Sequence, residues 1–463
     1  MIMSGAATAP AQMTAVESAR QVQEYMLDMW GKGLLISTAI VWAAGLVIGF
    51  TASLAIVAAL GVVAMLVGIR VPGVGLIGIG LLCICDPVLR TLVMTGGVLR
   101  YNTFNYAMVF VAVMSAAELA RMRSPQLGFA LAFMIVQIVW LAFTAAPLED
   151  AVIGVLNFAS YFGLCAFFAR ASWSGKAWLW QAMIGGVAGA MGGGLFVLKQ
   201  DGLPYVNHNV WSYLPLTAIF ALSLALLRGR VDGRTRLTMQ VLIMINAMWI
   251  FMSGSRGTML VAVCCIVFMV IALRKESAGL LVALGLFILG IGISATTEQG
   301  SQSLARIEKL LNESEDITGR TSGRADLFKG GWILFTEHPL GVGTGSFMYA
   351  WKGMGMREDL AKTVAGQRKA AHSAWIATLV EQGLIGIGLF APFILSFGWK
   401  GWMRRHQGLF LLGLWATLTL ALSFTATEFA SKGTWYLAAA ATVMLQYPPL
   451  SGNTPPPAGR EDA

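Results

Sequence analysis

Charge is scarce in this sequence. Of its 463 residues, 12% are Asp, Glu, Lys or Arg and 57% are hydrophobic, and the mean hydropathy is +0.71. A soluble domain carries about 25% charged residues, so a soluble globular protein is excluded. Apolar stretches of about 20 residues recur along the chain, and each is long enough to cross a hydrocarbon core of about 30 Å. The sequence therefore predicts an all-α, polytopic integral membrane protein with about 12–14 transmembrane helices.

Cysteine and histidine are also rare. The chain has five cysteines, none of them in a CxxC pair, and four histidines. An odd number of cysteines in or beside apolar runs supports neither a disulfide framework nor a zinc site. The cysteines therefore predict no metal site, and the pair Cys83 and Cys85 is interpreted as helix packing.

The formal net charge of the chain is +9. In a membrane protein such an excess is explained by the basic residues of its cytoplasmic loops, so no nucleic-acid partner is expected. Residues 1–30 are mixed polar and lack the apolar core and cleavage site of a signal peptide. A cytoplasmic tail or a surface helix is expected there.

Hydropathy places about fourteen candidate spans along the chain. Tight turns and Gly-rich joints leave a re-entrant segment open as an alternative in the first three spans and within 237–273. The candidate spans are 33–50, 51–70, 73–89, 104–120, 127–146, 151–169, 178–198, 211–227, 237–252, 257–273, 278–296, 373–396, 408–427 and 432–448.

The loops between these spans predict an orientation. With the N-terminus in the cytoplasm, the short outer loops hold Glu149, Asp150 and Asp201, and the basic residues fall in inner loops, as the positive-inside rule requires. Those basic residues are Arg121, Arg123, Arg170, Lys176, Arg228, Arg230, Arg234, Arg236, Arg274, Lys275, Lys400, Arg404 and Arg405.

Five regions follow from this orientation. They are a cytoplasmic tail (1–32), a first group of transmembrane helices (33–296), a large outer loop (297–371), a second group of transmembrane helices (372–448) and a Pro-rich, disordered cytoplasmic tail (449–463). Within the loop, 301–312 and 321–335 are expected to be helical, and "HPLGVGTGS" (338–346) is typical of turns. We expect the loop to fold against the membrane helices.

His372 stands immediately before the candidate span 373–396. Ser373 is a residue type that caps helix N-termini. A histidine at a helix N-terminus meets the positive end of the helix dipole, which disfavours the imidazolium form. A neutral imidazole is a competent general base, although an interfacial histidine without a role explains the position equally well.

Glu381 lies nine residues further along the same span, which in a straight helix is about 13 Å from its start. An acid at that depth is costly unless it is paired or hydrated, so it is a candidate supporting residue. A structural ion pair or a protonated acid is the alternative. Gly383 and Gly386 are interpreted as close helix packing.

Arginines on the outer side are candidate anion ligands. Arg256 lies in "SGSRG" (253–257) between two spans, and Arg320 and Arg324 flank the start of the helix expected at 321–335. A guanidinium group suits phosphate oxygens, and a helix N-terminus adds to such a site. Salt bridges or solvated helix ends are the alternatives. Arg100 is a further outer cation. "GVGTGS" lacks the strand and GK[ST] ending of a nucleotide loop.

Three stretches in order resemble the O-antigen ligase and O-antigen polymerase superfamily of bacterial membrane glycosyltransferases. They are "SGSRG" (253–257), "SGRADLFKGGWILFTEHPLGVGTGSF" (322–347) and "HSAWIATLVEQGLIG" (372–386). The last fits a ligase pattern of a histidine followed at fixed spacing by two glycines. The resemblance covers residues 205–400 well and the first 200 through hydropathy alone.

The resemblance implies an enzyme of the bacterial inner membrane with its site facing the periplasm. Such enzymes move a glycan from an undecaprenyl-diphosphate carrier to an acceptor, either a lipid A core sugar or another glycan, without ATP. The resemblance therefore also implies that no cofactor is expected. By resemblance His372 corresponds to the base, and Arg256 and Arg324, with Arg320 close by, correspond to diphosphate ligands.

Two alternatives stay open. An O-antigen or exopolysaccharide polymerase is the first, because ligases and polymerases share these motifs. The histidine-plus-glycines pattern favours a ligase slightly. The second alternative is a different class of protein, a polytopic transporter. Carriers usually show internal repeats and broken helices near the bilayer midplane, and the single large outer loop breaks any two-fold repeat.

Overall fold

The computed structural model describes nine continuous stretches of the chain and a few isolated positions between 285 and 308. The stretches are 15–96, 103–172, 174–199, 211–228, 231–272, 324–354, 371–403, 408–424 and 432–446. Every regular element in them is a helix. The predicted span 278–296 and the predicted helix 301–312 lie outside these stretches.

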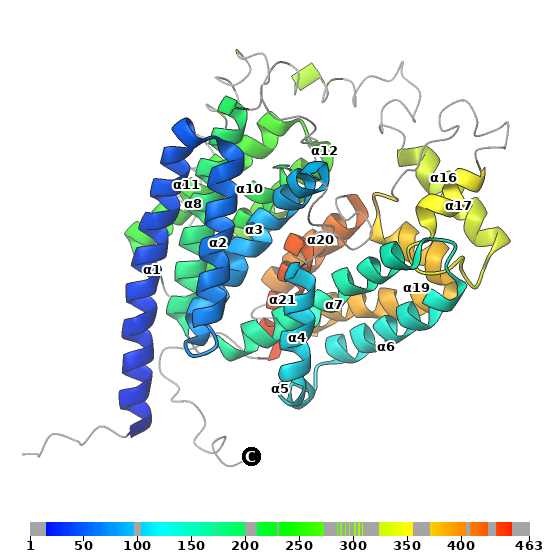
Figure 1. Ribbon diagram of the computed structural model, residues 1–463, viewed down its shortest axis with the longest axis horizontal. Coiled ribbons are helices and arrows are strands. Elements are labelled where there is room, and N and C mark those ends of the chain that lie inside the picture. Colours follow the sequence, from blue (N-terminus) through cyan, green and yellow to red (C-terminus); the bar gives the residue numbers. More distant parts are fainter. Residues whose placement is uncertain are drawn as a thin grey trace, which may run out of the picture.

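The first helices form one side of the bundle (Figure 1). They are α1 (Ala15–Ile48), α2 (Phe50–Val67) and α3 (Pro72–Gly96), followed later in the chain by α8 (Gly175–Lys199), α10 (Tyr213–Arg228), α11 (Gly233–Ser253) and α12 (Arg256–Ala272). Gly49, at φ 88°, turns the chain between α1 and α2. Gly61 and Gly78 face each other across α2 and α3, and an added Cβ at either would meet the other helix. Small residues here allow close packing.

The remaining helices form the other side, which carries the candidate site (Figure 1). They are α4 (Thr103–Met114), α5 (Ala116–Arg121), α6 (Pro125–Val139), the 3-10 helix η1 (Trp140–Phe143), α7 (Leu148–Arg170), α16 (Arg324–Glu337), α17 (Phe347–Met354), α19 (Ala374–Met403), α20 (Gly408–Phe424) and α21 (Lys432–Gln446).

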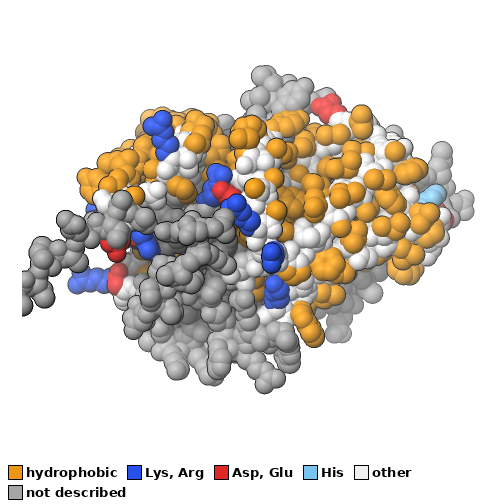
Figure 2. Space-filling view, turned by 90° about the horizontal axis from the view of Figure 1, so that it is seen from below, with side chains coloured by type: hydrophobic (Ala, Val, Ile, Leu, Met, Phe, Trp, Pro, Cys, Tyr) orange, Lys and Arg blue, Asp and Glu red, His pale blue; other side chains and the backbone are white. Residues whose placement is uncertain are grey.

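Hydropathy of the helices confirms the predicted fold class. Among the described residues, seven helices are long and apolar enough to cross a membrane, and four more are shorter apolar helices. Large apolar side chains also cover the outside of the bundle, with Val47 91% exposed, and they dominate the face shown in Figure 2. An exposed apolar surface of this extent belongs in a lipid environment.

Aromatic side chains fill the interior where α7, α19 and α21 meet. The Phe158 ring lies 5.1 Å from the Trp435 ring, and the Tyr161 ring lies 5.4 Å from the Phe393 ring. The Tyr161 hydroxyl shares a hydrogen bond of 2.7 Å with Thr442, which satisfies a buried polar group. This packing fixes α19, which contains Glu381 and begins just after His372, against the middle of the bundle.

One predicted boundary falls inside a helix. α1 runs without interruption across residue 32, where the sequence suggested a change from tail to first span. Its 34 residues reach about 51 Å at 1.5 Å per residue, which is longer than a hydrocarbon core of about 30 Å. The part of α1 that lies in the membrane stays a prediction.

Candidate active site

α19 is sharply bent at Gly383. This residue has φ 60° and ψ −150°, far from helical values. The rings of Trp375 and Phe390 lie 5.0 Å apart, whereas fifteen residues of straight helix would separate their Cα atoms by about 22 Å. The segments 374–382 and 384–403 therefore fold against each other. The span predicted at 373–396 is present as an apolar helix long enough to cross a membrane, but it is not one straight helix.

The turn segment 339–343 fills the gap that the bend opens. The amides of Val342 and Gly343 donate to the carbonyls of Val380 and Glu381, each at 3.0 Å, and the Leu384 amide donates to the Pro339 carbonyl at 3.0 Å. A break in a helix within a membrane is tolerated where such freed backbone groups find partners. Gly383 thus serves backbone conformation, and it also allows the close packing expected of it, since an added Cβ would meet the backbone of the turn segment.

Further bonds tie this segment to the corner between α6 and α7. The Trp140 indole donates to the Leu340 carbonyl at 2.7 Å, and the Thr144 hydroxyl donates to the Thr344 carbonyl at 2.7 Å. Thr344 in turn donates to the Gln137 carbonyl at 2.7 Å. The described part of the predicted outer loop is therefore folded against the membrane helices, as expected.

Glu381 is buried beside the bend, with 4% of its surface exposed. Its carboxylate accepts from the Phe347 amide at 3.2 Å and from the Gln382 side chain at 3.4 Å. Phe347 is the first residue of α17, and a negative charge at a helix N-terminus is favourable. Glu381 thus joins α19 to α17 through the Phe347 amide, a structural role different from the ion pair and the protonated acid that the sequence left open.

His372 precedes the first segment of α19 and is half-buried. Its backbone has φ 51°, a left-handed conformation that is uncommon for a residue other than glycine. Ser373 follows, and its hydroxyl accepts from the Ile376 amide at 3.5 Å, as an N-cap residue does. A residue held in such a conformation points to a functional constraint.

α16 runs parallel to the first segment of α19. Gly331 of α16 faces Ile376 and Val380, and the chain that leaves α16 reaches Leu384 through Pro339. Counting back at 1.5 Å per residue, Arg324 stands about 10 Å from Gly331, and His372 stands about 6 Å from Ile376. The two helices therefore begin at the same end, and the predicted residues Arg324 and His372 occupy those two starts.

Arg256 is the first residue of α12 and is half-buried. The turn before it is closed internally: the Gly254 amide donates to the Phe251 carbonyl, and the Ser255 amide donates to the Ser253 hydroxyl at 3.1 Å. The amides of Gly254 and Ser255 therefore already have partners within the turn. α12 packs on α20, and α20 packs on α19.

Arg320 and Arg100 lie outside the described residues. Within the described part of the chain, no group of three or more His, Cys, Asp or Glu side chains is placed to hold a metal ion.

A buried polar cluster joins α4, α7 and α21 and was not found from the sequence. Lys432 has no exposed surface, and its ammonium group donates to the side-chain oxygens of Asn105 and of Asn157, the latter at 2.8 Å. Asn105 also donates to Asn157 at 2.7 Å. The partners of Lys432 lie 275 and 327 residues away in sequence, so no local pattern could have indicated the cluster.

The apolar helices, the broken α19 and the loop docked into it define a polytopic membrane protein. Residues 240–391 match a family model described as O-antigen ligase. The chain therefore carries a domain of the O-antigen ligase and polymerase superfamily, which implies a membrane glycosyltransferase that uses lipid-linked glycans. No curated protein matches the chain.

Proposed function

We propose that this protein is an O-antigen ligase-like glycosyltransferase of the bacterial inner membrane. It would take a glycan from undecaprenyl diphosphate and transfer it to a hydroxyl of an acceptor sugar, such as that of a lipid A core, on the periplasmic face. A polymerase that uses another glycan as acceptor is the alternative within the same superfamily.

The reaction needs a base and a site for the leaving group. In the transfer, the acceptor oxygen forms a bond to the anomeric carbon, the bond from that carbon to the diphosphate oxygen breaks, and the acceptor proton goes to His372. Such help from a general base typically accelerates a reaction by about 10²–10⁴-fold. Arg256, Arg324 and Arg320 would hold the charge that develops on the diphosphate.

One observation supports this proposal above the others: the parallel packing of α16 on the first segment of α19. It puts the starts of two helices together, one with Arg324 and one with His372. Two helix N-termini at one place favour an anionic ligand. The matched stretch 240–391 also contains Arg256, Arg324 and His372 together.

The broken helix does not favour the transporter alternative. Carriers use unwound backbone in broken helices to coordinate ions or substrate. In α19 the carbonyls of Val380 and Glu381 accept from amides of the protein's own loop, so the break is already filled. It serves to fix the loop in place.

The glycan profile of a deletion strain tests the proposal. Loss of long-chain lipopolysaccharide together with accumulation of lipid-linked polymer indicates a ligase, and a single repeat unit on the acceptor indicates a polymerase. Complementation with the wild type should restore the profile, and complementation with His372→Ala should not. An unchanged profile in the deletion strain would contradict both enzyme activities.

A further inference from the structure

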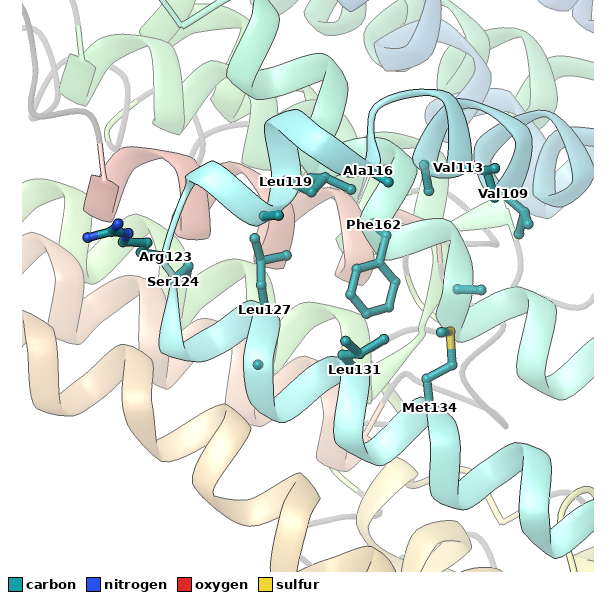
Figure 3. A pocket seen from close by; sticks show the side chains of 14 residues that line it. Val109, Val113, Ala116, Leu119, Arg123, Ser124, Leu127, Leu131, Met134 and Phe162 are labelled. Atoms are coloured by element: carbon teal, nitrogen blue, oxygen red, sulfur yellow. The ribbon is translucent and has the colours of Figure 1, made fainter. Parts of the chain in front are cut away.

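A groove lies between the α4–α5 pair and α6, on the side of the bundle away from α16. Its volume is about 480 Å³. Figure 3 shows α4 and α5 along one wall, α6 along the other, and the ring of Phe162 from α7 between them. The lining residues come from four helices and the turn between two of them, so the shape of the groove is fixed by the packing of the bundle.

The lining is apolar apart from one end. Apart from Arg123 and Ser124, all lining residues are apolar or glycine. Val113 and Leu131, on opposite walls, are 67% and 48% exposed. The groove therefore opens on the outer surface of the helices, where a membrane protein meets hydrocarbon chains.

The length of the groove corresponds to one leaflet. Along α6 it extends from Ser124 to Met134, a rise of about 15 Å over ten residues. Half of a hydrocarbon core of about 30 Å is the same length. An extended acyl chain lying along α6 would thus reach from the end near Ser124 to the middle of the bilayer.

Arg123 marks the headgroup end. It lies in the turn between α5 and α6, at one end of the groove (Figure 3), and its backbone has φ 43°. A left-handed conformation at an arginine is uncommon and needs a reason. The same end carries Arg121 and the ion pair of Arg170 with Glu118, at 3.0 Å. Charged side chains at one end indicate the level of the lipid headgroups.

We propose that this groove binds an anionic phospholipid of the leaflet next to Arg123. One acyl chain would lie in the groove along α6, and the lipid phosphate would pair with the Arg123 guanidinium, which suits phosphate oxygens. The site goes beyond glycan transfer and does not depend on it, because it uses none of the residues at the starts of α16 and α19.

Photolabelling of the full-length protein in lipid nanodiscs tests the acyl-chain part of the site. The probe is phosphatidylglycerol with a diazirine on one acyl chain, in a phosphatidylcholine background. Gly128→Phe should reduce labelling of residues 109–134 to background, because Gly128 lines the groove, an added Cβ there meets no atom within 4 Å, and the ring would occupy the space of the acyl chain. Gly154→Phe, at an equally open position outside the groove, is the matched control. Equal labelling in both variants would overturn the proposal.

A second pair of variants tests the headgroup contact and keeps the test decisive if Gly128→Phe does not fold. Arg123→Gln should lower the preference for phosphatidylglycerol over phosphatidylcholine about fivefold, the effect expected of one basic residue near an anionic surface. Arg121→Gln, which removes a basic residue from the same end but not from the lining of the groove, should lower the preference less. An equal loss in both variants would mean that the charge of the surface and not the groove sets the preference, and would overturn the headgroup contact. If undecaprenyl phosphate removes the label at equal concentration, the occupant is the glycan carrier and the phospholipid assignment is wrong.

Discussion

The indole ring of Trp375 packs edge-on against the ring of Phe390 at 5.0 Å, although both belong to α19 and fifteen residues separate them. This contact requires the bend at Gly383. It brings the start of α19 back along its own second segment, where α16 packs beside it. The position of His372 therefore depends on the bend as much as on the sequence next to the histidine.

Replacing Gly383 should disrupt the bend. Gly383→Ala places a side chain at φ 60°, and its Cβ would meet the Pro339 carbonyl. Only glycine readily adopts φ 60° and ψ −150°, so this conformation alone costs a residue with a Cβ about 1–3 kcal/mol, and the displaced loop adds to that cost. Thermal unfolding in detergent should show a lower midpoint, and segment 339–346 should become sensitive to protease.

Gly388→Ala is the matched control for this change. Gly388 lies five residues further along α19, and an added Cβ there meets no atom within 4 Å. In a helix alanine is favoured over glycine by about 1 kcal/mol, so this variant should be as stable as the wild type or more stable. Equal destabilisation of both variants would mean that the bend has no special need for Gly383.

The Glu381 side chain should be replaceable by an amide but not by a hydrocarbon. Glu381→Gln keeps an oxygen that accepts from the Phe347 amide. Glu381→Leu leaves that buried donor without its acceptor, which costs about 1–3 kcal/mol. Unfolding in denaturant should rank the stabilities as wild type, Gln, then Leu. A Leu variant as stable as the Gln variant would contradict the capping role of Glu381.

The cluster around Lys432 predicts a large coupling free energy between Asn157 and Lys432 in the stability of the protein. Asn157→Leu removes an acceptor of a buried ammonium group, which should cost about 3 kcal/mol because the charge stays buried. Lys432→Met removes the charge itself and should cost less. In the double variant, Asn157→Leu should be much less harmful than alone, as a double-mutant cycle would show. Additive effects would mean that the two side chains do not interact.

Asp232 predicts a pH dependence at the start of α11. Its carboxylate accepts from the Thr235 backbone amide at 2.9 Å and from the Thr235 hydroxyl, and these bonds lower the pKa of Asp232. Because the pKa is lowered on folding, the bonds to the Asp232 carboxylate stabilise the start of α11 at pH values above the pKa of this group in the unfolded chain. This stabilisation is lost as the pH falls through the pKa of Asp232 in the folded protein. Exchange of the Thr235 amide, corrected for its intrinsic pH dependence, should accelerate on acidification. Asp232→Asn keeps an acceptor that does not titrate, so exchange of the Thr235 amide in this variant should not accelerate on acidification.

The sequence predicted much of the fold because hydropathy and helix length are local properties. It predicted the helical membrane bundle, the helix that contains Arg324 and the cap at Ser373. It did not predict the bend at Gly383, because the apolar run continues through that residue and its partners lie in the loop 339–343. A glycine in an apolar helix indicates close packing or a special backbone conformation equally well.

The candidate site was found from residue types, but its geometry depends on contacts distant in sequence. The packing of α16 on α19 joins Gly331 to Ile376 across the outer loop, and Lys432 finds its partners in α4 and α7. Glu381 shows the difference most clearly. The sequence placed it deep in a straight span, whereas the structure places it at the bend and on the N-terminus of α17.

The rate of glycan transfer by His372→Ala tests the central claim most directly. The purified protein in liposomes would be given an undecaprenyl-diphosphate-linked glycan and an acceptor, with His338→Ala as control, because His338 is exposed at the end of α16. We expect His372→Ala to be slower by about 100-fold or more while the His338→Ala rate stays at the wild-type level. Transfer by His372→Ala at the wild-type rate would contradict the role of this histidine as the base.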